Sequence, residues 1–192
     1  MGNVINVSQE NTANVSTKSA ILRAGGGTLA LAMAMLEDKH LNALPHSDYP
    51  FGDQYPNGQL KIDDAANFGV FKMNWHMIKQ CPSMKMIAGN SAGSCSWRVA
   101  GARINGDPKL ATQLLMEAMK IWTSGAPNSA APLGNFWAGH RWGESGLKGI
   151  PPTDWNDVSC YYRSVQAIKQ KCDSDPTVWN TAVRYGSWVQ PV

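Results

Sequence analysis

Apolar residues recur at the spacing of an α-helix in four stretches of the chain. The first stretch runs from Thr28 to Glu37, directly after the glycines at 25–27, and alanines separate its larger apolar residues, Leu29, Leu31, Met33, Met35 and Leu36. A helix that is apolar on nearly every side belongs in a protein core. The pattern therefore predicts a buried helix that Thr28 caps and that ends near Glu37.

The second stretch begins at Asp63 or Asp64, either of which can cap a helix, and Pro82 ends it. Its larger apolar residues recur at intervals of three and four and form one stripe: Phe68, Phe71, Trp75 and Ile78. The stripe predicts a second helix that packs against the core. Trp75 shares this stripe with Phe71, so we interpret Trp75 as a core residue.

The last two stretches begin at prolines, which favour the first turn of a helix. Asp107-Pro108 has the pattern of an N-cap followed by the first helical residue, and the third predicted helix continues through Leu110, Leu114, Ala118 and Trp122. The fourth predicted helix opens after Pro151-Pro152, and one stripe of it holds Val158, Tyr161, Val165 and Ile168.

Strand periodicity is weak, so the sequence predicts a mainly α fold. A chain of 192 residues that is 43% hydrophobic closes one sizeable core. We therefore expect a single domain over 1–192, with the polar segment 1–24 packed on that domain or flanking it. The segments 41–62 and 123–152 are interpreted as long loops, which are usually functional in a compact domain.

Charge and hydropathy argue against two kinds of partner. The 17 lysines and arginines give a formal net charge of +3, but they are scattered and form no basic stripe for nucleic acid. The longest apolar run spans 29–36, far short of the roughly 20 residues that a membrane helix needs. No cysteines have the spacing of a zinc site, and we expect no metal or other cofactor.

Several features together suit a secreted protein. Two glycosylation sequons begin at Asn6 and Asn14, the chain has four cysteines, and only 16% of its residues are charged. The first ten residues lack the basic and apolar regions of a signal peptide, which fits a mature form with an added Met. We expect an extracellular monomer.

The cysteines allow three pairings of Cys81, Cys95, Cys160 and Cys172. Cys160 and Cys172 would lie about 18 Å apart along the fourth predicted helix, beyond the roughly 7 Å that a disulfide spans between Cα atoms. A disulfide would instead join the region 81–95 to the region 160–172. In the alternative, two or more cysteines are free buried thiols.

Two carboxylates occupy opposite predicted environments. Glu37 ends the buried helix, where desolvation and the negative pole of the helix dipole would raise the pKa of its carboxyl and suit a general acid. Asp53 lies in a polar turn, where exposure would keep it ionised as a general base. Such a pair is what a glycosidase requires. In the alternative, Glu37 only ends a helix and Asp53 only makes a turn; Glu144 is a rival acid, and Glu117 is interpreted as solvated.

Four blocks of the chain resemble glycoside hydrolase family 134: MAMLED at 33–38, DYPFGD at 48–53, DAANFGVFKMNW at 64–75 and FWAGHRWG at 136–143. The resemblance implies a catalytic domain with a lysozyme-like, mainly helical fold and endo-β-1,4-mannanase activity. It also implies that Glu37 is the general acid, that Asp53 is the general base and that the anomeric configuration inverts. The loops at 39–47 and 54–59 look longer than the family pattern. They lie on either side of the segment that holds Asp53, so the assignment of Asp53 as the base depends on how these loops align, and Asp48 is the next candidate for the second carboxylate.

The same blocks suggest where a sugar chain would bind. Donors suited to sugar hydroxyls are spread over the loop and the second predicted helix: Lys61, Asn67, Lys72 and Asn74. A glycine-flanked loop segment predicted to form a cleft wall holds His140, Arg141 and Trp142. His140 fits a hydrogen-bonded core position equally well. The expected partner is β-1,4-mannan or a manno-oligosaccharide, held in a cleft that the long loops form.

Two other functions stay open at this point. Another lysozyme-like glycosidase, a chitosanase or a muramidase, would use the same acid pair, although a chitosanase needs more carboxylates in its cleft than the sequence offers. A non-catalytic secreted glycan-binding protein would use the same aromatic and polar residues without hydrolysis.

Overall fold

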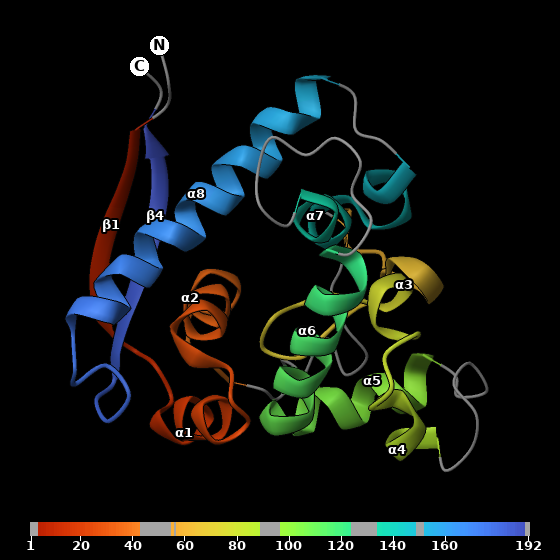
Figure 1. The fold of residues 1–192 in the computed structure, drawn as a ribbon, viewed down its shortest axis with the longest axis horizontal. Coiled ribbons are helices and arrows are strands. Elements are labelled where there is room, and N and C mark those ends of the chain that lie inside the picture. Colours follow the sequence, from red (N-terminus) through yellow and green to blue (C-terminus); the bar gives the residue numbers. More distant parts are fainter. Residues whose placement is uncertain are drawn as a thin grey trace.

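The computed structural model describes residues 4–42, 55, 57–88, 97–123, 134–148 and 152–190. These residues form eight α-helices, one 3₁₀ turn and two small antiparallel sheets (Figure 1). The prediction of a mainly α fold is confirmed. In the described ranges, no helix is both long and apolar enough to cross a membrane.

A two-stranded ribbon, which the sequence did not predict, joins the two ends of the described chain. Strand β1 (Val4–Asn11) runs antiparallel to β4 (Val183–Gln190). Helix α8 (Pro152–Ser174) packs diagonally along this ribbon (Figure 1). Arg184 on β4 donates through Nε to the carbonyl of Met35 at 3.0 Å, which ties the ribbon to helix α2 (Gly27–Glu37).

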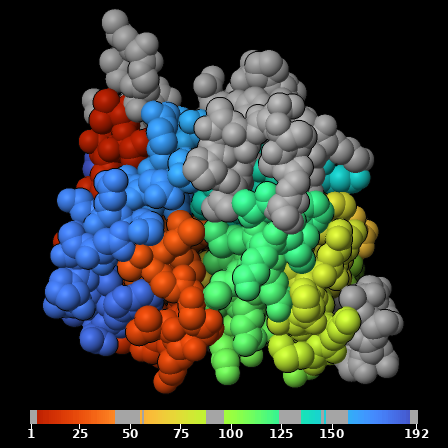
Figure 2. Space-filling model, viewed as in Figure 1, coloured from red at the N-terminus to blue at the C-terminus, as the bar shows by residue number. Residues whose placement is uncertain are grey.

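Helix α2 is buried from Ala30 to Met35, as predicted, and packs along α8 and against α1 (Val15–Arg23). In Figure 2 the orange surface of α1 and α2 separates the blue α8 from the green α6 (Pro108–Thr123). The prediction that Thr28 caps α2 is wrong: Gly26 is the N-cap, and Thr28 Oγ1 donates to Asp173 at 2.6 Å. A Cβ at position 26 would lie 2.8 Å from methyl groups of Ile21 and Thr112, so glycine allows α1 and α6 to approach closely.

The prediction of a second helix that begins at Asp63 or Asp64 and ends at Pro82 is wrong. Residues 63–78 form a 3₁₀ turn (Asp63–Ala65), a hairpin of β2 (Asn67–Phe68) and β3 (Met73–Asn74), and the short helix α3 (Trp75–Ile78). Gly69 (φ 71°) and Lys72 (φ 47°) adopt left-handed conformations that interrupt a helix. The apolar stripe, Trp75 included, is buried all the same, because the hairpin and α3 turn these side chains into the same core.

Two predicted helices are confirmed as α6 and α8. Asp107 caps α6 by accepting from the N–H groups of Lys109 and Leu110, each at 3.0 Å. The predicted loop 123–152, however, contains helix α7 (Gly134–Lys148), which has a kink at Gly143 (φ 57°). Its glycines suggested a loop, but burial of one face stabilises the helix. The remaining helices are α4 (Met84–Ala88) and α5 (Trp97–Gly106).

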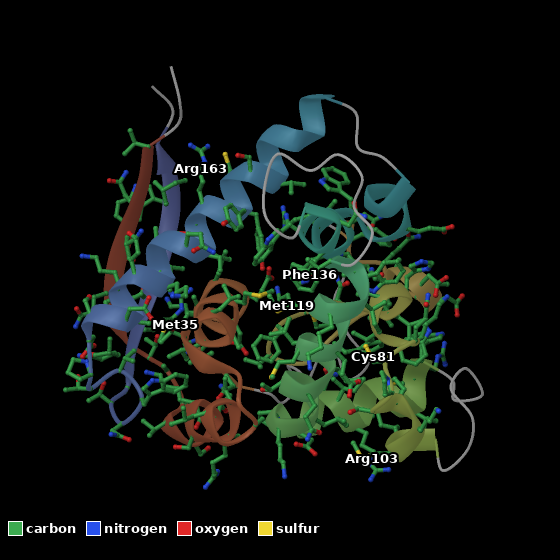
Figure 3. The ribbon with its side chains drawn as sticks, viewed as in Figure 1. Met35, Cys81, Arg103, Met119, Phe136 and Arg163 are labelled. Carbon is green, nitrogen blue, oxygen red and sulfur yellow. The ribbon has the colours of Figure 1, made fainter. Side chains whose placement is uncertain are left out.

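Cys81 and Cys172 are buried free thiols, so the predicted disulfide is not formed by either of them. The Cys81 thiol donates to the carbonyls of Met77 and Leu114, whereas Cys172 Sγ lies 3.9 Å from Met35 Sδ. In Figure 3 Met35, beside Cys172, lies to the left and Cys81 to the right, so the two thiols belong to different parts of the core. Burial raises the pKa of each thiol to about 12. Cys95 lies outside the described residues.

A buried lysine closes the turn between α8 and β4. Lys18 on α1 is fully buried, and its ammonium group donates to the carbonyls of Val178 at 2.6 Å, Thr181 at 2.9 Å and Val183. Burial lowers the pKa of Lys18 to about 8. Helix α1 therefore fixes a segment that lies about 160 residues further along the chain.

Candidate active site

Glu37 is the last residue of α2, and its carboxyl group meets side chains from α7 and α8. Its side chain is 13% exposed. Nε2 of His140, on α7, lies 3.3 Å from Oε1 of Glu37. The hydroxyl of Tyr161, on α8, forms a hydrogen bond with the same carboxyl group. Three helices thus contribute one side chain each to a buried polar cluster, which we call the Glu37 cluster (Glu37, His140 and Tyr161).

The contacts of His140 assign its hydrogen to Nε2. This atom also lies 2.9 Å from the Tyr161 hydroxyl, and the ring stacks on Phe136 of the same helix. Nδ1 is buried and has no hydrogen-bond partner among the described residues. Because a carboxylate oxygen can only accept, the hydrogen between it and Nε2 belongs to the ring, whether the imidazole is neutral or charged. His140 therefore donates to Glu37.

The prediction that Glu37 has a raised pKa is wrong. Burial does raise the pKa of this carboxyl, but the hydrogen bond and charge of His140, the hydrogen bond of Tyr161 and the positive charge of Lys72 outweigh burial and lower the pKa below its ordinary value. The sequence could not reveal these donors, because they lie more than 100 residues away in the chain. Burial and the charge of Glu37 raise the pKa of Tyr161 well above its ordinary value, so the hydroxyl keeps its hydrogen.

Two cations flank the Glu37 cluster. Lys72 is exposed in the turn between β2 and β3, and its charge acts on the Glu37 carboxyl. Arg141 follows His140 on α7 and places its guanidinium carbon 5.2 Å from the centre of the Tyr161 ring. The prediction that His140 and Arg141 lie in a loop is wrong, since both belong to α7. Among the described residues, two positive charges therefore lie beside the Glu37 cluster.

The other predicted substrate contacts lie in several places. Asn74 Oδ1 accepts the His76 N–H at 3.1 Å and caps α3, while Nδ2 lies 3.4 Å from Oδ1 of Asn67 across the hairpin. Lys61 Nζ lies 5.7 Å from the centre of the Tyr55 ring. Trp142 on α7 is 46% exposed. The structure thus uses Asn74 to hold the fold, and it leaves a large aromatic surface at Trp142.

The predicted base, Asp53, and its substitute Asp48 lie outside the described residues. Among the other acids considered, Glu144 is exposed on α7. Glu117 accepts from the backbone N–H of Ser83 at 2.9 Å and from its hydroxyl at 2.6 Å. The interpretation of Glu117 as a solvated residue is therefore wrong, because it binds the residue that precedes α4.

Tyr161 was predicted only as part of an apolar stripe, and the structure adds it to the candidate site. The signal was its hydroxyl group, because a buried tyrosine usually needs a hydrogen-bond partner for that group. Its aliphatic neighbours on the stripe, Val158 and Val165, have no such requirement. A polar residue on a buried face is therefore the pattern that could have indicated this position.

A polar hollow of about 550 Å³ lies elsewhere, between β1, the end of α8 and β4, and none of the predicted site residues lines it. The Asp175 carboxylate at this hollow already binds Tyr185 at 2.9 Å and Thr177 at 2.6 Å. Within the described ranges, no three His, Cys, Asp or Glu residues group in a way that could hold a metal ion. The Glu37 cluster is therefore the candidate active site.

A largely buried carboxyl group held by two polar side chains, on a mainly helical fold, defines a candidate acid–base hydrolase. Residues 15–190 match the family model described as Glycosyl hydrolase family 134, and the chain belongs to this family. The protein is therefore an enzyme that hydrolyses glycosidic bonds, and its mainly helical structure is consistent with a lysozyme-like fold. A comparison with curated proteins found no match.

Proposed function

We propose that the protein is an endo-acting β-1,4-mannanase that inverts the anomeric configuration. The observation that supports this most directly is the position of Glu37, which stands where the family resemblance expects the acid. The Glu37 side chain is 13% exposed, so its carboxyl group is largely buried but can still contact a substrate. Hydrogen bonds with His140 and Tyr161 hold it in place. These are the properties of a group that exchanges a proton with a bound sugar.

In the proposed reaction, Glu37 donates its proton to the glycosidic oxygen as the bond from that oxygen to the anomeric carbon breaks. Asp53 removes a proton from a water molecule, whose oxygen attacks the anomeric carbon from the opposite face. Glu37 is then ionised and Asp53 is protonated, and proton exchange with solvent restores both. The two carboxyl groups supply both proton transfers, so the proposal includes no metal or cofactor.

Glu37 must carry a proton when this reaction starts, although its pKa in the free enzyme is lowered, which favours the ionised form. A sugar ring placed over the cluster would remove the remaining contact of Glu37 with water. Desolvation favours the neutral form of a carboxyl group. Substrate binding would therefore itself favour the protonated acid.

The charges near Glu37 bear on the choice of substrate. Lys72 and Arg141 would repel the ammonium groups of chitosan, which argues against a chitosanase. A neutral mannan meets no such repulsion, and Trp142 offers a flat surface on which a sugar ring could stack. Because polymeric mannan does not cross membranes, we also propose that the enzyme acts outside the cell.

One experiment tests both the substrate and the stereochemistry. Mannopentaose is mixed with the enzyme, and proton NMR of the anomeric region is recorded within minutes, beside parallel digests of chitosan and peptidoglycan. We expect internal cleavage of the mannan chain and a new reducing end that appears first as the α-anomer. A β-anomer at the start would contradict inversion, and cleavage of chitosan or peptidoglycan alone would contradict the mannanase proposal.

A further inference from the structure

The Glu37 cluster contains more hydrogen-bonding groups than a single acid requires. The Tyr161 hydroxyl lies 2.9 Å from Nε2 of His140 and also bonds the Glu37 carboxyl. Tyr161 is nearly fully buried, and its ring lies 5.8 Å from that of Trp137, which holds the hydroxyl in place. Contacts with His140 and Trp137 therefore hold the Tyr161 side chain beside the carboxyl group.

The direction of each hydrogen bond follows from the hydrogen on Nε2 of His140. Two oxygen atoms share the hydrogen on Nε2: Oε1 of Glu37, 3.3 Å from Nε2, and the Tyr161 oxygen, 2.9 Å from Nε2. The Tyr161 oxygen accepts from His140, so its own hydrogen is available to Glu37. The carboxylate thus receives two donors that are both buried.

We propose, on the basis of the function proposed above, that Tyr161 is a positioning residue of the hydrolytic reaction. It holds Glu37 as a carboxylate in the free enzyme, while the bond from His140 to Oε1 directs the acid proton to Oε2 when substrate is bound. The carbonyl oxygen of a neutral carboxyl group is its better acceptor. Oε1, which accepts from His140, therefore stays the carbonyl oxygen, and the proton is carried by Oε2.

The charged and titratable groups around Glu37 come from three directions. His140 and Arg141 belong to α7, Tyr161 belongs to α8, and Lys72 belongs to the turn between β2 and β3. Lys72 acts on Glu37 through its charge alone, whereas Tyr161 also supplies a directional donor. Removal of the hydroxyl would therefore change the protonation of Glu37 without changing the charge of the site.

The test is the substitution Tyr161→Phe, which removes the hydroxyl and keeps the ring. Tyr162→Phe is the matched control, because Tyr162 is the next residue of α8 and its ring lies 5.4 Å from that of Trp137. The protein is labelled with ¹³C at the side-chain carboxyl of its four glutamates, and the signal of Glu37 is assigned with Glu37→Gln. The carboxyl titration and the pH dependence of kcat/KM are then measured for each variant.

We expect Tyr161→Phe to raise the pKa of Glu37 by about one unit, the size of effect that one lost donor has on a buried carboxylate. The alkaline limb of the kcat/KM profile should move to higher pH by the same amount, and neither should move in Tyr162→Phe. A merely structural role would lower activity at every pH and leave the limb in place. An unmoved Glu37 titration, or a moved titration with an unmoved limb, would overturn the proposal.

Failure of the function proposed above is recognised separately. If the wild-type enzyme cleaves no mannan, that function is wrong, while the carboxyl titration still decides whether Tyr161 sets the protonation of Glu37. If Tyr161→Phe does not fold, the five tyrosines are replaced by 3-fluorotyrosine, whose phenol is a stronger donor. The pKa of Glu37 should then fall, and an unchanged pKa would reject the proposal.

Discussion

Nε2 of His140 lies 3.3 Å from Oε1 of Glu37, although 103 residues separate the two in the chain. The contact joins the end of α2 to the buried face of α7. Burial raises the pKa of this carboxyl group, and the hydrogen bond with His140 is the largest of the effects that together lower it below its ordinary value. The protonation of Glu37 therefore depends on the packing of α7 and α8 as much as on the helix that carries it.

Glu37→Gln should remove hydrolysis and leave binding of manno-oligosaccharides, because the amide keeps the shape of the side chain and has no acid proton. We expect a loss of about 10² to 10⁴-fold in kcat on mannopentaose, with binding followed by calorimetry. The loss should be smaller on a mannosyl fluoride, whose leaving group needs no proton. Glu144→Gln, which changes an exposed glutamate, is the control, and a Glu37→Gln enzyme that kept more than half of its activity would exclude Glu37 as the acid.

The pH dependence should separate the free enzyme from the complex. The kcat/KM profile reports the free enzyme, in which the pKa of Glu37 is lowered, so kcat/KM should fall as pH rises through this lowered pKa. The kcat profile reports the complex, in which substrate desolvates Glu37. Its alkaline limb should lie at higher pH by about one unit or more. If the alkaline limbs of the kcat and kcat/KM profiles coincided, the idea that substrate binding favours the protonated form of Glu37 would be contradicted.

Lys18→Met should destabilise the protein by about 3 kcal/mol, roughly 1 kcal/mol for each of the three carbonyls that lose a donor. Urea unfolding at pH 7 measures the change, and Lys171→Met, at an exposed lysine of α8, should change little. An equal effect of the two substitutions would show that the ammonium group does not hold the turn.

The same lysine gives a stability that depends on pH. Because burial lowers the pKa of Lys18 from 10.5 to about 8, the unfolded chain binds more protons than the folded protein between these values. The free energy of unfolding of the wild type should therefore rise relative to that of Lys18→Met between about pH 8 and pH 10.5. A constant difference over this range would mean that Lys18 does not titrate at a lowered pKa.

Cys81 and Cys172 should resist alkylation in the folded protein, because the pKa of each thiol is about 12 and both side chains are buried. Iodoacetamide at pH 8, followed by peptide mapping, measures this. Both should stay unmodified during the time in which the urea-unfolded chain reacts at both positions. Equal rates in the two states would show that the thiols are accessible.

Local patterns in the sequence predicted what depends on local physics. Asp107 caps α6 because cap and first turn are adjacent in the chain, and the apolar residues around Met33 require burial in any arrangement. Between Asp63 and Ile78 the apolar spacing fitted a helix, but Gly69 and Lys72 adopt left-handed conformations and the chain forms a hairpin there. Burial was thus predictable there, whereas backbone shape was not.

The candidate site was predictable residue by residue and not as an arrangement. Glu37 and His140 were both identified, yet the pattern around each gave no sign that they touch. Tyr161 looked like a core residue because the stripe around it is aliphatic. The pKa of Glu37 was misjudged for this reason, since its direction depends on donors from α7 and α8.

The ribbon of β1 and β4 sets an order in time for the newly made chain. Strand β1 leaves the ribosome well before its partner β4, so β1 stays unpaired while the chain between the two strands is made. Contacts between such distant segments form late and slow folding. Arg184 reaches the carbonyl of Met35, two residues before Glu37, only after β4 has emerged. Nascent chains that still lack β4 contain all three residues of the Glu37 cluster, yet the end of α2 that carries the proposed acid acquires the contact with Arg184 only after β4 has been made.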